Sequence, residues 1–373
     1  MGFKLKDELE LTIYFNGEEY PLDSGNSFNE LRLSESTKLI LPTLYLNIVD
    51  SANTLLDKGF LDGTIIKLCI LSKGKVLQEL EFVLYSYRVS YNGGAYSYEI
   101  DAYLNVPKYW CGVLMNPLQG SSSSIMQQIA QNCGLVYEGD VSQDRRSVCS
   151  LNTPYWQLAR KVCNTAWGGN QACFHHGVTL DKVLRFKNIM RISKVTKTLK
   201  AFNAPEGKDE LSISSYFCTS NSGSLNRAGG YREILVIQSV VENPEVIKEI
   251  SIKTDSNNPD VSASIRDQIQ RGYIRFSPIS CSLGDNNLNK GKYYSGRIDK
   301  IFSYDISMQG TEPTKLALFD LVDFVAKGKD ETPDSVVSGK YILTGKTITI
   351  QGAVYSETYF ATRMGTNYKN KEK

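Results

Sequence analysis

Two adjacent histidines, His175 and His176, are the only histidines in the 373-residue chain. They fall in an extended stretch, so their side chains are expected to point to opposite faces of a strand. No Ser or Cys nucleophile motif lies near them, and no Gly-x-Ser-x-Gly sequence occurs. Cys163 and Cys173 could join His175 around zinc, but their spacing fits no standard signature and a fourth ligand is missing nearby. These residues predict core positions, with no metal and no catalytic site.

Two further patterns could support chemistry, and both favour ordinary strands. The stretch 339–347 (GKYILTGKT) has five residues between its glycines, whereas a phosphate loop needs four, and its β-branched residues predict a strand. Asp320 and Asp323 fall in an alternating stretch and are expected on a solvated face. A glycosidase pair stays open as an alternative, because its two carboxylates can lie far apart in sequence.

The composition is that of a globular protein that is not dedicated to nucleic acid. Lysine and arginine number 42 against 40 aspartates and glutamates, and the net charge is +2. The lysine-rich stretches 194–200 and 369–373 are expected to be solvated. The eight cysteines form no Cys-x-x-Cys pair, and no run of eighteen apolar residues occurs, which predicts reduced thiols and no membrane segment. The 22 tyrosines suit half-buried strands and protein interfaces.

The strongest local pattern is a β-hairpin. Residues 82–91 and 95–104 flank Asn92-Gly93-Gly94, and a turn of this kind requires positive φ at its central residues. The other predicted strands are 8–15, 36–49, 64–71, 172–177, 183–186, 211–218, 234–241 and 246–253. The chain is expected to close with a β-rich segment over 316–326 and 339–364.

Two helices are predicted between the hairpin and the later strands. Ser121–Ser124 can cap a helix over 122–133, and Gly134 stands where the helix should end. A second helix over 154–165 is expected to start with Thr153 as its N-cap and Pro154 in its first turn.

The hairpin is repeated near the end of the chain. Residues 82–102 align without a gap on residues 341–361, with five identities in 21 positions. The identical pairs are Leu84 and Leu343, Gly93 and Gly352, Tyr96 and Tyr355, Ser97 and Ser356, and Ala102 and Ala361. Shared turn glycines and Tyr-Ser pairs favour duplication of a β-domain, and the period is far too long for a solenoid.

These patterns predict a mainly β fold with α+β insertions, in which two duplicated antiparallel β-barrel domains flank an α+β insertion module. We expect the first barrel in residues 1–106 and the insertion module in 107–195. Residues 196–310 would start the second barrel and carry inserted loops and strands, and 311–373 would hold its closing hairpin and a C-terminal tail. A trimer of such a two-copy chain would present six similar units around its axis.

Three stretches together resemble the baseplate or tail hub proteins of contractile-tailed bacteriophages, which include late control D proteins and are related to the N-terminal half of type VI secretion spikes. Residues 42–71 look like the first barrel of that family, residues 119–137 with 153–166 look like its helical insertion, and residues 338–365 look like its closing hairpin. One departure is Lys346-Thr347-Ile348, where the family commonly has a histidine.

The resemblance implies a structural, non-enzymatic virion protein without cofactor or catalytic residues, assembled in the host cytoplasm. It implies a homotrimeric pseudo-six-fold ring that adapts the six-fold tail tube to a three-fold spike. An axial channel would pass a tape-measure protein or DNA. The alternative is a tail-associated glycan-binding or wall-degrading protein, in which Trp110 and Trp167 would stack on sugars, although core packing is the simpler interpretation of both.

Overall fold

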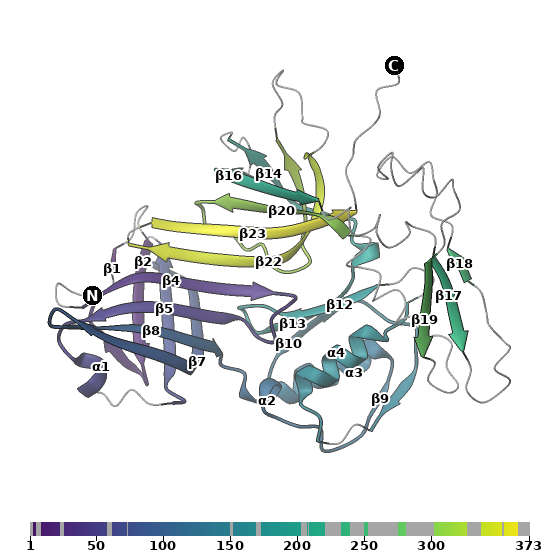
Figure 1. Cartoon of the computed structure of the whole chain (residues 1–373), viewed down its shortest axis with the longest axis horizontal. Helices are drawn as coiled ribbons and strands as arrows, with labels where there is room; N and C mark the ends of the chain where they lie inside the picture. Colours follow the sequence, from purple (N-terminus) through teal and green to yellow (C-terminus); the bar gives the residue numbers. More distant parts are fainter. Residues whose placement is uncertain are drawn as a thin grey trace.

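The structure is a computed structural model that describes residues 3–4, 9–22, 26–57, 62–72, 74–149, 152–168, 173–202, 207, 209–220, 233–238, 250–252, 275–280, 302–326, 337–352 and 354–364. Most strands belong to one large curled sheet that forms a half-barrel (Figure 1). The mainly β fold with an α+β insertion is thereby confirmed. Both ends of the chain contribute to this sheet.

The N-terminal part supplies the first half of the sheet. A short helix, α1 (Thr54–Asp57), follows its fifth strand. The strands are β1 (Phe3–Lys4), β2 (Leu9–Phe15), β3 (Glu18–Tyr20), β4 (Asn26–Ser36), β5 (Thr43–Asp50), β6 (Ile65–Ser72), β7 (Lys75–Asn92) and β8 (Ala95–Leu104). They pair in the order β2-β6-β7-β8-β5-β4, which leaves β4 to contact the second half.

The C-terminal part supplies the second half of the sheet. Its strands are β14 (Val195–Ala201), β15 (Glu210–Ile213), β16 (Ser215–Ser220), β20 (Phe302–Gly310), β21 (Leu321–Val325), β22 (Gly339–Gln351) and β23 (Val354–Met364). A separate three-stranded sheet lies between β16 and β20 in the chain and consists of β17 (Glu233–Gln238), β18 (Ile250–Ile252) and β19 (Arg275–Ser280).

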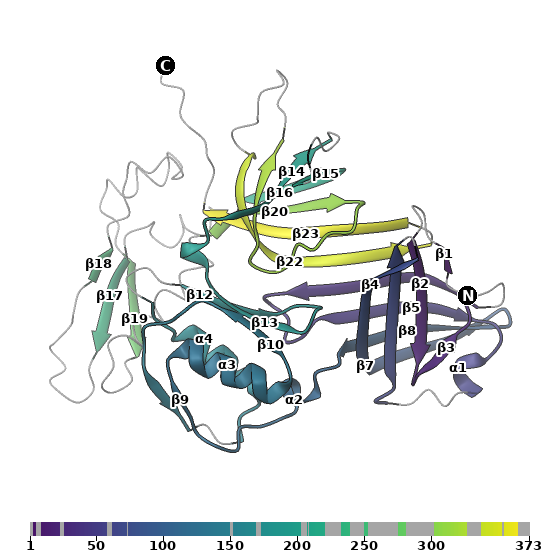
Figure 2. The ribbon, with the colours of Figure 1, turned by 180° about the vertical axis from the view of Figure 1, so that it is seen from behind.

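The insertion between the two halves is the predicted α+β module. It contains α2 (Pro107–Trp110), β9 (Leu118–Gly120), α3 (Ser122–Cys133), β10 (Val136–Gly139), β11 (Arg146–Val148), α4 (Tyr155–Asn164), β12 (Phe174–Val178), β13 (Val183–Asn188) and the 3₁₀ helix η2 (Ile189–Arg191). Both views place the module at the end of the sheet opposite to the β22–β23 turn (Figures 1 and 2).

The helix signals of this module act nearly as predicted. The Ser121 hydroxyl accepts the Ser124 N–H at 3.2 Å, and Gly134 ends α3 in the left-handed conformation, with φ 74°. The expected N-cap of the second helix was wrong by one residue, because Pro154 rather than Thr153 precedes α4. Pro154 has an extended ψ of 144° and no side-chain donor or acceptor, so the first turn of α4 starts without a side-chain cap.

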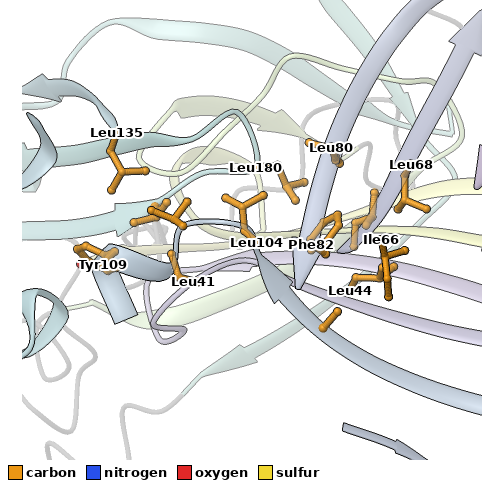
Figure 3. Close-up of a cluster of buried hydrophobic side chains, with 14 of the residues drawn as sticks. Leu41, Leu44, Ile66, Leu68, Leu80, Phe82, Leu104, Tyr109, Leu135 and Leu180 are labelled. Carbon is orange, nitrogen blue, oxygen red and sulfur yellow. The ribbon is translucent and has the colours of Figure 1, made fainter. Parts of the chain in front are cut away.

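A continuous apolar core joins the first half of the sheet to the insertion module. Leu44 and Leu104 come from strands β5 and β8 and Leu41 from the turn before β5, whereas Tyr109 and Leu180 come from the module (Figure 3). All five are at most 4% exposed. Complete burial of a leucine side chain stabilises a fold by about 1.5–3 kcal/mol, so this seam fixes the module against the sheet.

Two predicted strands were too long, and the strand predicted over 211–218 is divided at Ser214 into β15 and β16. Residues 36–49 do not form one strand, because β4 ends at Ser36 and a turn with a Leu39 N–H to Ser36 O bond precedes β5. The strand predicted over 316–326 begins only at Leu321, since Asp320 accepts the Ala317 N–H in a turn. No described helix is long and apolar enough to cross a membrane.

Candidate functional site: the junction between the repeated hairpins

The predicted hairpin residues lie at the turns of two long strand pairs. Gly93 and Gly94 connect β7 to β8 with φ values of 62° and 97°, and Gly352 has φ 54° between β22 and β23. The remaining predicted residues occupy matching pairs. Tyr96 pairs with Tyr91 and Ser97 with Ser90, while Tyr355 pairs with Ile350 and Ser356 with Thr349.

The two hairpins have the same register over their whole shared length. Leu84 pairs with Ala102 in the first hairpin, and Leu343 pairs with Ala361 in the second. A β-bulge follows immediately in both hairpins, before Ser86 and before Gly345. Because a bulge re-aims every later residue of its strand, its matching position gives the two hairpins the same inward and outward faces.

The likeness extends beyond the hairpins to five strands in each half. The order β4-β5-β8-β7-β6 in the first half corresponds to β16-β20-β23-β22-β21 in the second, and every adjacent pair is antiparallel. The strands also follow one another along the chain in the same sequence. The correspondence ends beyond β6, where β2 is antiparallel but its counterpart β14 is parallel to β21.

The halves meet where the tip of β22 pairs with the edge of β4. Ile348 stands opposite Leu33 and Ile350 opposite Leu31, and all four side chains are at most 2% exposed. Ser34 and Thr347 form a side-chain hydrogen bond of 3.1 Å on the other face of the pair. This contact joins segments more than 300 residues apart, and no local pattern in the sequence predicts it.

A buried ion pair lies beside this junction and was not predicted. The Lys346 Nζ is 3.1 Å from the Glu357 Oε1 and donates to the Thr314 carbonyl at 3.0 Å. Glu357 also accepts hydrogen bonds from the Tyr355 and Tyr359 hydroxyls and from the Thr314 N–H and hydroxyl. Charges this deeply buried persist only when they are paired and hydrogen bonded, as Lys346 and Glu357 are. The one sequence signal was the stretch Lys346-Thr347-Ile348, where the family that the chain resembles commonly has a histidine.

A second buried carboxylate faces Lys346 across the junction. Glu35 is 3% exposed and accepts the Leu180 N–H of the insertion module at 2.8 Å. Burial raises the pKa of Glu35 to about 7, although the Leu180 hydrogen bond and the positive charge of Lys346 oppose this shift. Glu35 thus connects the first half, the second half and the module at one point.

Substituting Gln for Glu35 is expected to stabilise the protein in alkaline solution. Because the folded-state pKa is raised, the folded protein binds a proton more tightly, and native stability falls as pH rises from about 4.5 to about 7. Gln removes that loss and can still accept the Leu180 N–H. Urea unfolding is expected to show about 2–3 kcal/mol more stability for E35Q at pH 8 and near parity at pH 4.5. An advantage of equal size at both pH values would contradict the raised pKa, and the half-exposed Glu99→Gln serves as control.

The other candidate residues do not assemble into a chemical site. His175 and His176 are half-buried neighbours in β12, and burial lowers the pKa of His176 to about 4. The Cys163 thiol donates to the Phe174 carbonyl at 3.2 Å, and no group of three or more possible metal ligands occurs among the described residues. Residues 339–347 are part of strand β22, as predicted.

Asp320 was expected on a solvated strand face, but it lies in a polar cleft between the insertion module and the second half of the sheet. This carboxylate is bound by Arg185 at 2.9 Å and does not stand on a solvated strand face. Arg185 also contacts Glu138 at 3.2 Å, and Lys187 binds Glu138 at 2.8 Å. Partial burial disfavours the charged form of Glu138, but these two cations outweigh burial and lower its pKa. Glu138 and Asp320 are thus ion-paired, which is unsuited to a general acid, and Asp140, the third carboxylate that lines the cleft, accepts the Asn188 N–H at 2.7 Å.

The two tryptophans of the sugar-binding alternative are half-buried. Trp110 packs against Tyr103 and Tyr85, with ring centroids 4.7 Å and 5.6 Å away. Trp167 lies at the end of the described stretch that follows α4, and its carbonyl accepts the Gln143 N–H at 2.7 Å. Trp110 packs against the apolar core and the indole nitrogen of Trp167 is buried, although Tyr85 beside Trp110 is 56% exposed.

Solved structures share this architecture over almost the whole chain. A tail protein from Neisseria meningitidis MC58 aligns with a TM-score of 0.61 at 9% identity and covers 95% of this chain and 96% of its own. The 43 kDa tail protein of prophage MuSo2 from Shewanella oneidensis gives 0.60 at 11%, with 95% and 98% covered.

A third match is a component of the E. coli type VI secretion system that is described as similar to bacteriophage T4 tail proteins. It gives a TM-score of 0.50 at 11% identity, with 97% of this chain and 79% of the other covered. No protein-family model and no curated protein matches the sequence. The chain therefore has the fold of phage tail proteins and of a type VI secretion component.

Proposed function

We propose that this protein is the structural hub of a phage tail baseplate. Three copies would form a ring in which the two halves of each chain alternate, and six similar units would then surround an axial channel. The observation that carries this proposal is the pair of five-stranded units with the same order and the same registers inside one chain. The similarity of its fold to that of phage tail proteins supports the proposed place in a phage tail.

Such a ring would adapt one symmetry to another. Six similar units can seat a six-fold tail tube, whereas the insertion module occurs once per chain and would repeat with three-fold symmetry toward a spike. The module lies at one end of the sheet and the β22–β23 turn at the other, which gives the ring two different faces (Figure 2). The channel would hold a tape-measure protein or pass DNA, and the protein would act without an enzymatic reaction or cofactor.

Imaging of the assembled tail tests this proposal. We expect three copies of the chain in one ring, with the first half of each copy next to the second half of its neighbour. One copy or six copies in a well-resolved tail would contradict it. A single copy whose polar cleft holds glycan would favour the wall-binding or wall-degrading alternative.

A further inference from the structure

The tip of the first hairpin carries exposed apolar residues at positions that are buried in the second hairpin. By the shared register, Val89 corresponds to Ile348 and Tyr91 to Ile350. Val89 is 45% exposed and Tyr91 65% exposed, whereas the two isoleucines are at most 2% exposed. The isoleucines are buried because β4 covers the tip of β22. Among the described strands, the corresponding part of β7 pairs only with β8.

Strand β16, the counterpart of β4 in the second half, also has inward-facing residues that are less buried than those of β4. Strand β16 pairs with β20 as β4 pairs with β5, so that Tyr216 corresponds to Leu31 and Cys218 to Leu33. Both leucines are fully buried against β22, whereas Tyr216 and Cys218 are half-buried. Phe217, on the other face of β16, is 69% exposed. Within the described part of the chain, β20 is the only strand that pairs with β16.

We propose that β16 of a neighbouring copy pairs antiparallel with the tip of β7 and so repeats between molecules the junction that β4 and β22 form within one. The internal register then fixes the intermolecular one. Val89 stands opposite Cys218, Tyr91 opposite Tyr216, and Arg88 opposite Thr219 of the neighbour. The pairing rests on the proposed ring and names the surfaces that would close it.

The chemistry of the two edges agrees with this pairing. Isolated sheet edges are normally protected by charged residues or proline, since unprotected edges pair with other chains. Residues 215–220 (SYFCTS) contain neither, and residues 86–92 (SYRVSYN) contain one arginine. Arg88 would face Thr219, so the register places no like charges opposite one another. Aromatic and aliphatic residues would be buried together, as in stable interfaces.

The arrangement of the two edges also decides what kind of assembly results. Each chain carries one β7 tip and one β16 edge, so the contact joins two different surfaces. Such heterologous contacts generate a closed ring when the rotation between copies closes, and an open filament when it does not. The β4–β22 junction relates the first half of a chain to its second half. If β7 and β16 pair in the same way between chains, each further half would be added by a similar rotation.

A cysteine cross-link tests the register directly. Directly opposed residues of antiparallel strands have Cα atoms about 4.5–5.5 Å apart, which suits a disulfide. We expect V89C, oxidised in the assembled particle, to form an intermolecular disulfide with the native Cys218, identified by peptide mass spectrometry. Val89 is half exposed, so the substitution leaves the fold intact. Two controls are expected to lack this link: V89C combined with Cys218→Ser, and R88C, whose side chain points to the other face.

The cross-linked species separate failure of the pairing from failure of the proposed function. Covalent species of up to three copies on a denaturing gel would support both the pairing and the trimer. A disulfide between position 89 and Cys218 in species larger than three copies would retain the pairing and overturn the trimer. Particles with three copies per ring but no such link would retain the hub and overturn the pairing.

Discussion

Substituting Met for Lys346 is expected to lower the free energy of unfolding by about 3–5 kcal/mol. The Glu357 carboxylate, which is 1% exposed, would then remain buried without its cation. Met has nearly the volume of the lysine stem, so the loss reports the missing charge more than a cavity. Urea unfolding of the full chain at neutral pH measures it.

A surface ion pair provides the matched control for this substitution. Lys67 Nζ lies 2.6 Å from Glu79 Oε1, but the two side chains are 34% and 50% exposed. We expect K67M to cost much less than K346M, because water screens a pair this exposed. The double variant K346M/E357Q should recover part of the loss, because it leaves no isolated buried charge. An equal loss of unfolding free energy in K346M and K67M would contradict the prediction, because the buried pair would then contribute no more than an exposed pair.

Substituting Ala for Asp144 is the second change with a large expected effect. The Asp144 carboxylate has no exposed surface, binds the Arg146 guanidinium, and accepts the Ser122 N–H at 3.0 Å at the start of α3. Its removal leaves Arg146 as a nearly buried charge and deprives the first turn of α3 of an acceptor. We expect a loss of about 3–5 kcal/mol by urea unfolding at pH 7.

The pH dependence distinguishes this role of Asp144 from simple packing. Burial disfavours the charged carboxylate, but hydrogen bonds from Ser122 and the charge of Arg146 outweigh it and hold its pKa below the usual 3.8. The carboxylate therefore contributes its full stability above about pH 4, and the contribution is lost as pH falls through the lower folded-state pKa. The D144A deficit should shrink only in acid, whereas the exposed Asp101→Ala should cost no more than about 0.5 kcal/mol at any pH. A deficit that stays constant into acid would indicate lost packing alone.

Features governed by neighbouring residues were predictable from the sequence. Helix α3 covers the predicted residues 122–133, because its Ser cap and Gly134 exit act within one turn of the chain. The hairpin at Gly93 was equally visible, since its turn and alternating strands are local. The position of the insertion between the halves followed from the order of these signals.

Features that depend on distant segments were missed. Strand β4 was not predicted before residue 36, and its bulge between Phe28 and Glu30 interrupts the period of two. Strand β14 falls in the lysine-rich stretch that was expected to be solvated, but it lies between β15 and β21. Strand β20 alternates Phe302, Tyr304, Ile306 and Met308, and this signal could have revealed it. The β4–β22 junction requires a tertiary contact that no window of sequence contains.

The ion pair at Lys346 distinguishes the β4–β22 junction within the chain from the proposed junction between copies, which would share its geometry. Its counterpart in the first hairpin is Tyr87, a neutral side chain that is 40% exposed. Desolvation of a lysine is costly, and for Lys346 this desolvation occurs when the chain folds and the Glu357 carboxylate comes next to it. The neutral Tyr87 side chain can stay exposed in the separate chain and be buried later at an interface, without the desolvation penalty of a charge. If β22 instead of β7 paired with β16 of another copy, Lys346 would stand opposite Ser220 and would lack the Glu35 carboxylate that faces it within its own chain. Under the proposed pairing, the edge that carries Lys346 would pair only during folding of its own chain, and the edge that carries Tyr87 would pair only after two folded copies meet.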